Sequence, residues 1–284
     1  MNDSALHLTD RHFKSVATLI ESQIGIKLPP AKRVMIEGRL QKRVRALKQS
    51  SVNEYVERLF EDGQLESELV DLIDCVTTNK TDFFREPSHF EFVRHVAVNE
   101  LLALRGRTSR LIKIWSAACS TGMEAYTTAM VLDDLQMKRR GFEFRILGTD
   151  ISTSVLRVAK AGIYPRDMLA PVPAEMAQRY FLSARDRTRA DLRVVPELRR
   201  RVNFTRMNLM DPSYPVDQDV DIIFCRNVLI YFDKVTQRKV VDRLCRHLRP
   251  GGYFLVGHSE SMVHQGSVGL KQVQPTIFQN VARR

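Results

Sequence analysis

The sequence predicts an α/β protein, in which a small all-helical N-terminal domain precedes a doubly wound, mostly parallel β-sheet. Three observations support this fold class. Apolar residues recur at helical spacing up to residue 76, short apolar strands alternate with helical segments from Leu111 onward, and one strand ends in a turn of small residues. With 284 residues the chain is long enough for one large or two smaller domains.

Residues 1–76 are predicted to form the helical domain. Thr9 or Asp10 can cap a first helix that ends near Gly25, and further helices are expected at 31–48, 52–60 and 65–76. The second helix carries a basic surface beside one apolar stripe. Its candidates for docking an acidic partner are Arg39, Lys42, Arg43 and Arg45. A solvated face without any partner explains the same charges equally well.

Residues 77–110 are predicted to be a linker followed by a helix that leads into the sheet domain. The segment CVTTNKTDFFREP has no regular apolar period, yet it places polar side chains beside Phe83 and Phe84. A polar segment with two aromatic residues is expected to lie against another part of the protein, at least as an anchored linker. Pro87 then begins a helix that runs to about Leu104.

Residues 111–284 are predicted to form the sheet domain. Strands are expected at 111–117, 144–149, 203–207, 220–225 and 253–257, and helices at 124–136, 152–160 and 234–248. The last segment, 271–281, can return as an edge strand. Residues 162–201 interrupt the alternation, and short alternating segments near 180–182 and 192–195 predict a small inserted antiparallel β-subdomain.

The first of these strands ends in the small-residue run 116–122, and a helix follows at once. Such a turn is where an α/β sheet holds a nucleotide-like ligand, although the full G-x-G-x-x-G spacing is missing. Asp150 closes the next strand, where a carboxylate can accept hydrogen bonds from ribose hydroxyls or only cap the helix that starts near Ser152. Together the turn and the acid favour a nucleoside-type ligand.

Polar residues also follow two later strands. Asn208 ends one strand, and Arg226, Asn227 and Tyr231 follow the strand at 220–225. The carboxyl ends of parallel strands meet at one edge of a sheet, so these side chains should face the same crevice as Asp150. Taken alone, Asn227 is explained by a turn and Tyr231 by a place in the core, but the convergence of several polar strand ends favours a binding site.

The composition indicates which kinds of partner the protein can bind and in which compartment it works. A net charge of +11 and a pI near 9.7 imply an acidic partner, which is a nucleic acid, an anionic membrane surface or an acidic protein. The four cysteines are far apart and lack zinc-ligand spacing, which predicts reduced, mostly buried thiols in a cytoplasmic protein and no metal site. No signal-peptide or membrane-spanning pattern is evident, so neither export nor membrane insertion is expected.

The motifs RLQKRVRAL, TTNKTDFFRE, WSAACSTGMEAY, FCRNVLIYFD and GHSE resemble those of the CheR family of chemotaxis receptor methyltransferases. The resemblance covers almost the whole chain. It implies a Rossmann-like methyltransferase sheet that uses S-adenosylmethionine, releases S-adenosylhomocysteine and methylates glutamate side chains of chemoreceptors. The partners it implies are the cytoplasmic domains of chemoreceptors. No nucleic acid is expected as a partner, and the protein is expected to be a monomer.

The resemblance also implies roles for individual residues. Arg85 and Tyr231 are expected near the transferred methyl group. The cofactor site is expected to be lined by Asn79, Thr81, Arg85, Glu124, Asp150, Asn208, Leu209, Arg226 and Asn227. Met123 stands where the family usually has a second acid, and Ala125 stands where proline is common. These two departures bear on cofactor affinity, while the retained Glu124 argues for a working site.

Two other functions fit parts of the sequence. A nucleic-acid methyltransferase agrees with the charge and the fold, although CRNVLIYFD differs from the Pro-Pro-Tyr type of motif and no RNA-binding module is recognisable. A catalytically silent cofactor-binding sensor or scaffold agrees only with Met123 and Ala125.

In the CheR family the β-subdomain can bind a receptor peptide as an added strand. The loop 184–191 lacks the glycine of the tethering versions, although Arg185, Arg187 and Arg189 can attract an acidic peptide. We expect no high-affinity tether.

Overall fold

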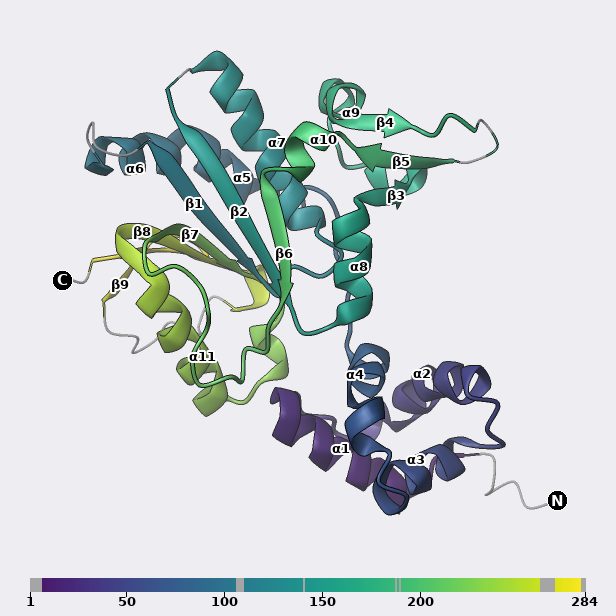
Figure 1. The fold of residues 1–284 in the computed structure, drawn as a ribbon. Helices are drawn as coiled ribbons and strands as arrows, with labels where there is room; N and C mark the ends of the chain where they lie inside the picture. Colours follow the sequence, from purple (N-terminus) through teal and green to yellow (C-terminus); the bar gives the residue numbers. More distant parts are fainter. Residues whose placement is uncertain are drawn as a thin grey trace.

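The computed structural model describes residues 7–105, 110–139, 141–186, 188, 190–260 and 269–281. A helical domain, coloured purple to blue, lies at one end of the molecule, and a larger sheet domain lies at the other (Figure 1). The chain passes between them through the segment that follows α4. This arrangement confirms the predicted fold class.

The helical domain consists of α1 (Asp10–Ile24), a short 3₁₀ turn (Pro30–Lys32), α2 (Arg33–Ala46), α3 (Val52–Glu61) and α4 (Leu65–Val76). The Thr9 side chain caps α1 by accepting a hydrogen bond from the His12 amide, and Gly25 ends the helix with a left-handed φ of 72°. The apolar faces of the four helices share one core, which includes Val16, Ile20, Ile36, Leu40 and Tyr55.

The linker is anchored as predicted. Phe83 is fully buried, and its ring packs edge-on against Tyr164 and Phe181, with centroids 5.1 and 5.5 Å away. The helix that Pro87 begins continues to Arg105, but it contains one π-helical stretch between α5 (Pro87–Phe92) and α6 (Val98–Arg105). The linker therefore holds its polar residues against the sheet domain.

The main sheet has the strand order β6-β2-β1-β7-β8-β10-β9 within the described residues. Its strands are β1 (Leu111–Ala117), β2 (Glu143–Asp150), β6 (Val202–Arg206), β7 (Val220–Cys225), β8 (Leu248–Val256), β9 (Leu270–Gln274) and β10 (Ile277–Asn280). The first five strands in spatial order are parallel to one another. β10 runs antiparallel to β8, and β9 runs antiparallel to β10.

The prediction of a single returning edge strand at 271–281 was wrong. Pro275 and Thr276 form a turn, with Thr276 at a φ of 62°, and split the segment into a hairpin. Proline cannot donate to a strand ladder, so the chain reverses there. β10 lies inside the sheet, and β9 forms its edge.

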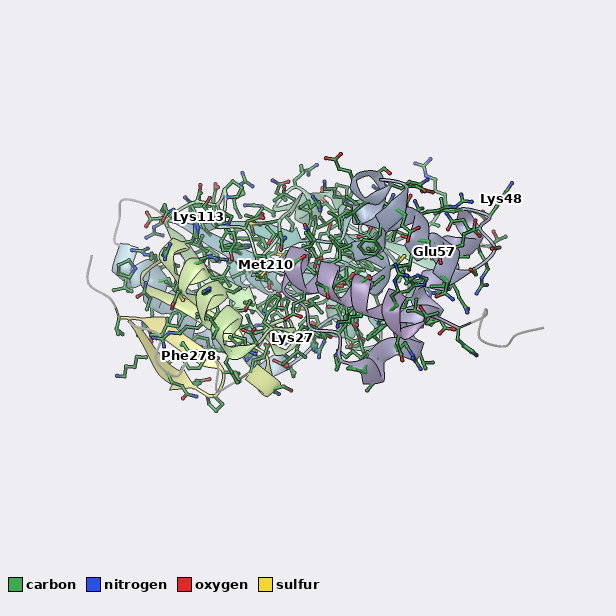
Figure 2. All side chains as sticks on the ribbon, turned by 90° about the horizontal axis from the view of Figure 1, so that it is seen from below. Lys27, Lys48, Glu57, Lys113, Met210 and Phe278 are labelled. Carbon is green, nitrogen blue, oxygen red and sulfur yellow. The ribbon has the colours of Figure 1, made fainter. Side chains whose placement is uncertain are left out.

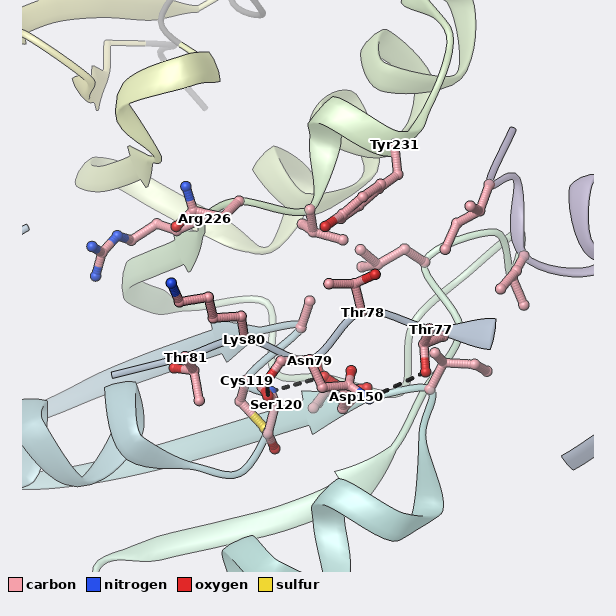
Figure 3. Close-up of a pocket in the computed structure, with 18 of the residues that line it drawn as sticks. Thr77, Thr78, Asn79, Lys80, Thr81, Cys119, Ser120, Asp150, Arg226 and Tyr231 are labelled. Carbon is pink, nitrogen blue, oxygen red and sulfur yellow. Dashed lines mark hydrogen bonds between the residues drawn. The ribbon is translucent and has the colours of Figure 1, made fainter. Parts of the chain in front are cut away.

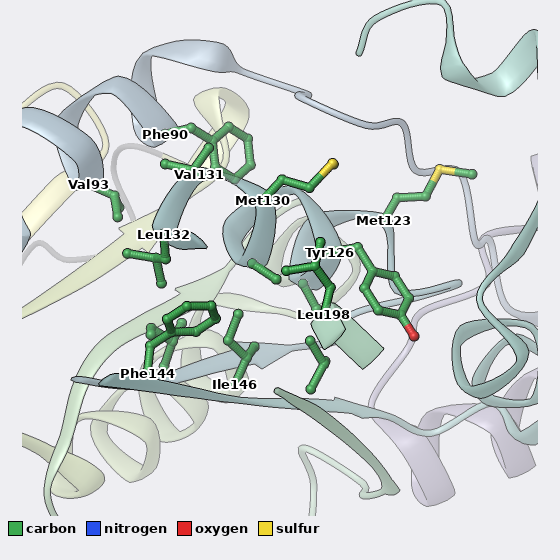
Figure 4. Packing of buried hydrophobic residues seen from close by; sticks show 14 of the residues in the cluster. Phe90, Val93, Met123, Tyr126, Met130, Val131, Leu132, Phe144, Ile146 and Leu198 are labelled. Atoms are coloured by element: carbon green, nitrogen blue, oxygen red, sulfur yellow. The ribbon is translucent and has the colours of Figure 1, made fainter. Parts of the chain in front are cut away.

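Helices cover both faces of the sheet. Alternate residues of β1 point to opposite sides, so Ile114 packs beneath α7 (Met123–Lys138) while Trp115 packs beneath α11 (Lys234–His247). Figure 4 shows the first of these layers, where Met130 of α7 lies above Phe144 and Ile146 of β2. α8 (Thr153–Ala161) packs beside β2 and β6. This is the predicted doubly wound arrangement.

The inserted β-subdomain contains β3 (Ile163–Pro165), a 3₁₀ turn (Arg166–Leu169), α9 (Ala174–Tyr180), β4 (Phe181–Ser183), β5 (Asp191–Val194) and α10 (Pro196–Arg199). Its strands are antiparallel in the order β3-β5-β4. β3 and α9 were not predicted, because Pro165 suggested an irregular connector; it is tolerated at the end of an edge strand. Arg187 and Arg189 lie outside the described residues.

The four cysteines are free thiols, as predicted, with Cys119 and Cys225 buried and Cys75 and Cys245 partly buried. Among the described residues, no helix is both long enough and apolar enough to cross a lipid bilayer.

Candidate active site

A cavity lies where the carboxyl ends of β1, β2, β6 and β7 meet the linker and the helical domain. Figure 3 shows it from close by, with Asp150 and Ser120 facing residues 77–81 of the linker and Tyr231 on the opposite wall. Every residue that was predicted to bind the cofactor or act on the methyl group lines it: Asn79, Thr81, Arg85, Glu124, Asp150, Asn208, Leu209, Arg226, Asn227 and Tyr231.

The turn after β1 explains why the sequence needs small residues there. Ala118, Ser120 and Gly122 have left-handed φ values of 59°, 50° and 84°. A Cβ on Gly122 would lie 2.8 Å from the Cβ of Ala159, so glycine is required by both backbone and space. The turn brings main-chain atoms close to the cavity.

Asp150 ties this turn to the next loop. One carboxylate oxygen accepts a hydrogen bond from the Ser120 amide at 2.8 Å, and the other accepts one from the Ser152 amide at 2.9 Å. Ser152 itself caps α8, so Asp150 is not the N-cap. Burial raises the pKa of the Asp150 carboxyl, although these amide hydrogen bonds act in the opposite direction.

Glu124 and Arg226 form a buried ion pair at the floor of the site. Arg226 Nη1 lies 3.0 Å from one Glu124 oxygen, and the Ser116 hydroxyl donates to the other at 2.6 Å. Burial raises the pKa of Glu124, and the Arg226 guanidinium opposes that shift. Arg226 also contacts Glu86 at 3.1 Å and donates to the main-chain oxygen of Arg85. Its guanidinium is thus held by protein groups on several sides.

Tyr231 and Asn227 are positioned by a residue that sequence reasoning did not single out. Glu260 is almost fully buried, and its carboxylate accepts hydrogen bonds from the amides of Asn227 and Leu229, each at 2.7 Å. These bonds fix the loop after β7, in which Asn227 has a left-handed φ of 58° and Tyr231 ends a 3₁₀ turn. The motif GHSE, which contains Glu260, was the available signal.

Arg85 enters the cavity from the linker. Its Nη1 donates to the main-chain oxygen of Lys80 at 3.1 Å, which keeps the side chain alongside its own segment. On the other wall, Lys32 of the helical domain places Nζ 5.5 Å from the centroid of the Tyr231 ring. Arg85, Lys32 and Tyr231 all line the cavity, and Lys32 lies beside Tyr231.

The helical domain forms one wall of the cavity, which the sequence did not predict. Its lining residues are Ile24, Ile26, Leu28, Lys32, Met35 and Val76. A Cβ on Gly25 would lie 2.6 Å from Met210 Sδ, so the end of α1 packs directly on the sheet domain. In Figure 2, Met210 is labelled where the end of α1, coloured purple, meets the sheet domain.

A second contact between the domains uses Asp74 of α4. Its carboxylate accepts hydrogen bonds from the Thr153 amide at 2.9 Å, the Thr153 hydroxyl at 2.9 Å and the Ser154 amide at 3.0 Å. These donors form the first turn of α8, just after Asp150. The helical domain therefore helps to hold the loop that carries the acidic residue of the site.

The basic surface of α2 divides into two kinds of residue. Arg43 makes a bidentate ion pair with Glu68 at 2.7 and 2.9 Å. Arg39 donates to the main-chain oxygens of Val76 and Thr77 at the start of the linker. Lys42 and Arg45 are exposed. Arg39 and Arg43 thus have roles inside the domain, and the other two cations face solvent.

Two protein-family models match this chain. The family model of the CheR methyltransferase SAM binding domain matches residues 79–277, and that of the CheR methyltransferase all-alpha domain matches residues 11–77. The chain belongs to the CheR methyltransferase family. Its cofactor is S-adenosylmethionine, as predicted, and the boundary between the two family models falls in the linker.

Three curated relatives of the CheR family illustrate the similarity. The chemotaxis protein methyltransferase of Borreliella burgdorferi is 34% identical, over 96% of this chain and 95% of the relative. Chemotaxis protein methyltransferase 2 of Pseudomonas aeruginosa is 36% identical, over 96% and 94%. The Escherichia coli chemotaxis protein methyltransferase is 38% identical, over 91% and 87%. The chain is therefore a methyltransferase of the chemotaxis type along nearly its whole length.

Proposed function

We propose that the protein transfers the methyl group of S-adenosylmethionine to glutamate side chains of chemoreceptors, forming glutamyl methyl esters. The observation that carries this proposal is that residues of the linker, the strand ends and the helical domain line one cavity. The reaction takes place in the cytoplasm, and the protein acts as a monomer. Its partners are the cytoplasmic domains of chemoreceptors.

The residues around the cavity suit the cofactor. Each Asp150 oxygen accepts one main-chain hydrogen bond and has further acceptor capacity for a ribose hydroxyl. The small-residue turn at 116–122 allows a ligand to approach the main chain closely. Asn79, whose main-chain oxygen accepts a hydrogen bond from the Ser120 hydroxyl at 2.9 Å, and Thr81 also line the cavity. When bound, the cofactor supplies a methyl group on a positively charged sulfur.

The glutamate side chain that accepts the methyl group needs little activation by the protein. A glutamate side chain is ionised at neutral pH and is already a nucleophile, so no general base is required. In-line alignment of the two partners can supply about 7–11 kcal/mol of the barrier reduction. Opposite charges neutralise as the methyl moves, so a cavity that excludes water favours the reaction.

Arg85 and Tyr231 have positioning roles in this scheme. A tight ion pair between Arg85 and the acceptor carboxylate weakens as that carboxylate loses its charge, so it stabilises the ground state more than the transition state. Arg85 therefore orients the carboxylate, and the Tyr231 hydroxyl donates a hydrogen bond to it. Lys32 adds a positive charge beside the Tyr231 ring.

Docking of the receptor uses the exposed cations of α2. Lys42 and Arg45 face solvent on the helical domain, and the net charge of +11 favours an acidic partner. Arg39 and Arg43 contribute indirectly, because their contacts hold α2 against α4 and the start of the linker.

The chemistry of the product tests the proposal. The purified protein is incubated with methyl-labelled S-adenosylmethionine and a receptor cytoplasmic fragment, and the fragment is then treated with mild base. Carboxyl methyl esters release labelled methanol, whereas methylated nucleic-acid bases do not. In a parallel incubation with nucleic acid in place of the receptor fragment, base-stable label would favour the alternative substrate. Binding of S-adenosylhomocysteine without any transfer would favour the silent scaffold.

A further inference from the structure

Glu86, His89 and His258 form a cluster outside the cavity. Glu86 and His89 lie at the start of α5, and His258 follows β8. One side-chain atom from each residue lies within 4.8 Å of the other two. His89 Nδ1 is 3.6 Å from Glu86 Oε2, and His258 Nε2 is 4.0 Å from the same oxygen. We call these three residues the Glu86 cluster.

The Thr276 hydroxyl has two neighbours. Its oxygen lies 2.6 Å from the main-chain oxygen of Pro275, to which it can donate its only hydrogen. With that hydrogen used, it accepts a hydrogen bond from His89 Nε2, which lies 2.7 Å away. With the proton on Nε2, the neutral imidazole presents the lone pair of Nδ1 on its other side.

That lone pair faces another acceptor. His89 is 1% exposed, and its Nδ1 is buried without a hydrogen-bond partner. The nearest polar atom of the cluster is Oε2 of Glu86, which carries no proton to share when ionised. Two buried acceptors that face each other are unfavourable unless a cation lies between them.

The geometry points to a binding site for a divalent first-row transition-metal ion, with Zn²⁺ as the best fit, held by Glu86, His89 and His258. Two imidazoles and one carboxylate are a set that zinc accepts, with a water molecule in the fourth position. Ligands at zinc distances in a tetrahedron lie about 3.4 Å apart. The two distances from Glu86 Oε2, 3.6 and 4.0 Å, are close to this value, and the ligand atoms of the two histidines lie within 4.8 Å of each other.

The surroundings meet the other requirements of a metal site. The bond from His89 to Thr276 is an outer-shell contact of the kind that orients ligating histidines. The His258 side chain is 61% exposed, so it provides a path to solvent and can swing the short distance that tightens the site. Glu86 is the N-cap residue of α5 and His89 lies in its first turn, so both side chains are attached to ordered backbone.

Arg226 limits the affinity of the site. Its Nη2 and Nε contact the same Glu86 oxygen at 3.1 and 3.3 Å. A metal ion would bind the Glu86 oxygen through the lone pair that now faces Arg226 Nε. Arg226 would keep its bond to Glu124 at 3.0 Å. The buried carboxylates of Glu86 and Glu124 outnumber the single guanidinium, so the local charge still favours a cation.

Titration calorimetry of the full chain, free of any histidine tag and previously treated with a chelator, tests the site. We expect one zinc ion per chain and a melting temperature that rises with zinc concentration. The exposed His258→Ala change should lower zinc affinity by more than about tenfold. His95→Ala is the matched control, because His95 is also exposed and lies 3.0 Å from Glu91. It should leave the tight zinc binding unchanged.

Two further variants test the tautomer argument. Thr276→Ala removes the acceptor for His89 Nε2 and should weaken zinc binding by about 10–100-fold, as loss of an outer-shell partner does. Thr276→Ser keeps the hydroxyl and should bind zinc like the unchanged protein. Cobalt should bind with visible absorption bands typical of imidazole ligation. Absence of a saturable zinc site, or equal affinity in His258→Ala and His95→Ala, would overturn the proposal. Methyl transfer is not measured in these experiments, so the outcome is independent of the proposed function.

Discussion

The side-chain amide of Asn208 donates a hydrogen bond to the main-chain oxygen of Gln23, 2.7 Å away. Its other polar atom, Oδ1, accepts a hydrogen bond from the Met210 amide at 3.0 Å. Asn208 follows β6 of the sheet domain, and Gln23 lies in the last turn of α1. A residue expected only to face the cofactor thus also joins the two domains at the wall of the cavity.

Asp150 is predicted to dominate binding of the nucleoside part of the cofactor. Asp150→Ala should lose one or two charge-assisted hydrogen bonds, worth about 1.5–3 kcal/mol each, and should also loosen the contact with Ser120. Calorimetry with S-adenosylhomocysteine measures the loss. Asp150→Asn keeps one acceptor oxygen and should lose less. Unchanged affinity in both variants would show that Asp150 does not bind the ribose.

Cofactor affinity should fall in mild acid. Burial raises the folded-state pKa of Asp150 above 3.8, so its carboxyl takes up a proton at a higher pH than an exposed aspartate does. The protonated form accepts hydrogen bonds less well, so affinity for S-adenosylhomocysteine should be full above the raised pKa and decline as pH falls through it. Asp150→Asn should show a flatter profile, with any remaining slope from Glu124, whose pKa is also raised by burial. An identical profile in the variant would contradict this assignment.

Arg85 and Tyr231 are predicted to act on the acceptor carboxylate. Arg85→Ala and Tyr231→Phe should therefore reduce turnover far more than they reduce affinity for S-adenosylhomocysteine. Arg85→Lys, which keeps the charge but not the planar fork, should recover only part of the activity. Steady-state kinetics and calorimetry give the two quantities. Equal losses in both would place these side chains in the cofactor pocket alone.

Receptor docking should depend on the exposed cations of α2. Reversing Lys42 and Arg45 to glutamate should slow methylation mainly at low ionic strength, because such charges are screened beyond about 8 Å at physiological salt. The matched control reverses Lys239 and Arg246, which are exposed on α11. It changes the net charge equally and should have a smaller effect. Equal slowing by both pairs would indicate a general charge effect.

Gly122 should be intolerant of a side chain. Gly122→Ala forces a Cβ to 2.8 Å from Ala159 at a φ of 84°, and should destabilise the protein by about 1–3 kcal/mol. Gly38→Ala is the control, because Gly38 lies inside α2 with no atom within 4 Å of the added Cβ. It should stabilise by about 0.5–1 kcal/mol. Urea unfolding measures both, and similar changes of the same sign would refute the steric argument.

Local signals in the sequence were sufficient for most elements and for the cavity residues that follow strands, while the family resemblance supplied the cavity residues of the linker. Thr9 and Gly25 marked the ends of α1 by capping chemistry, and strand ends located Asp150 and Arg226 because parallel strands share one edge. The hairpin of β9 and β10 was missed, since a short segment with one proline did not reveal a second strand.

Contacts between distant residues could not be predicted in this way. The Glu86 cluster joins residues 172 positions apart, so no local spacing pointed to it. Likewise, the hydrogen bonds of Glu260 and the internal ion pair of Arg43 depend on how elements pack after folding. Charge in the sequence showed that α2 is basic, but not which of its cations would be taken up inside the domain.

The contact of Asp74 with the first turn of α8 has a consequence for how the protein loses its structure. If the helical domain melted first, the amides of Thr153 and Ser154 would lose their acceptor beside the loop that holds Asp150. The stability of each domain therefore depends on the other, and heating should produce one cooperative transition in calorimetry, with no separate early melting of the four N-terminal helices. A catalytic half prepared without residues 1–76 should consequently be less stable than its share of the intact chain.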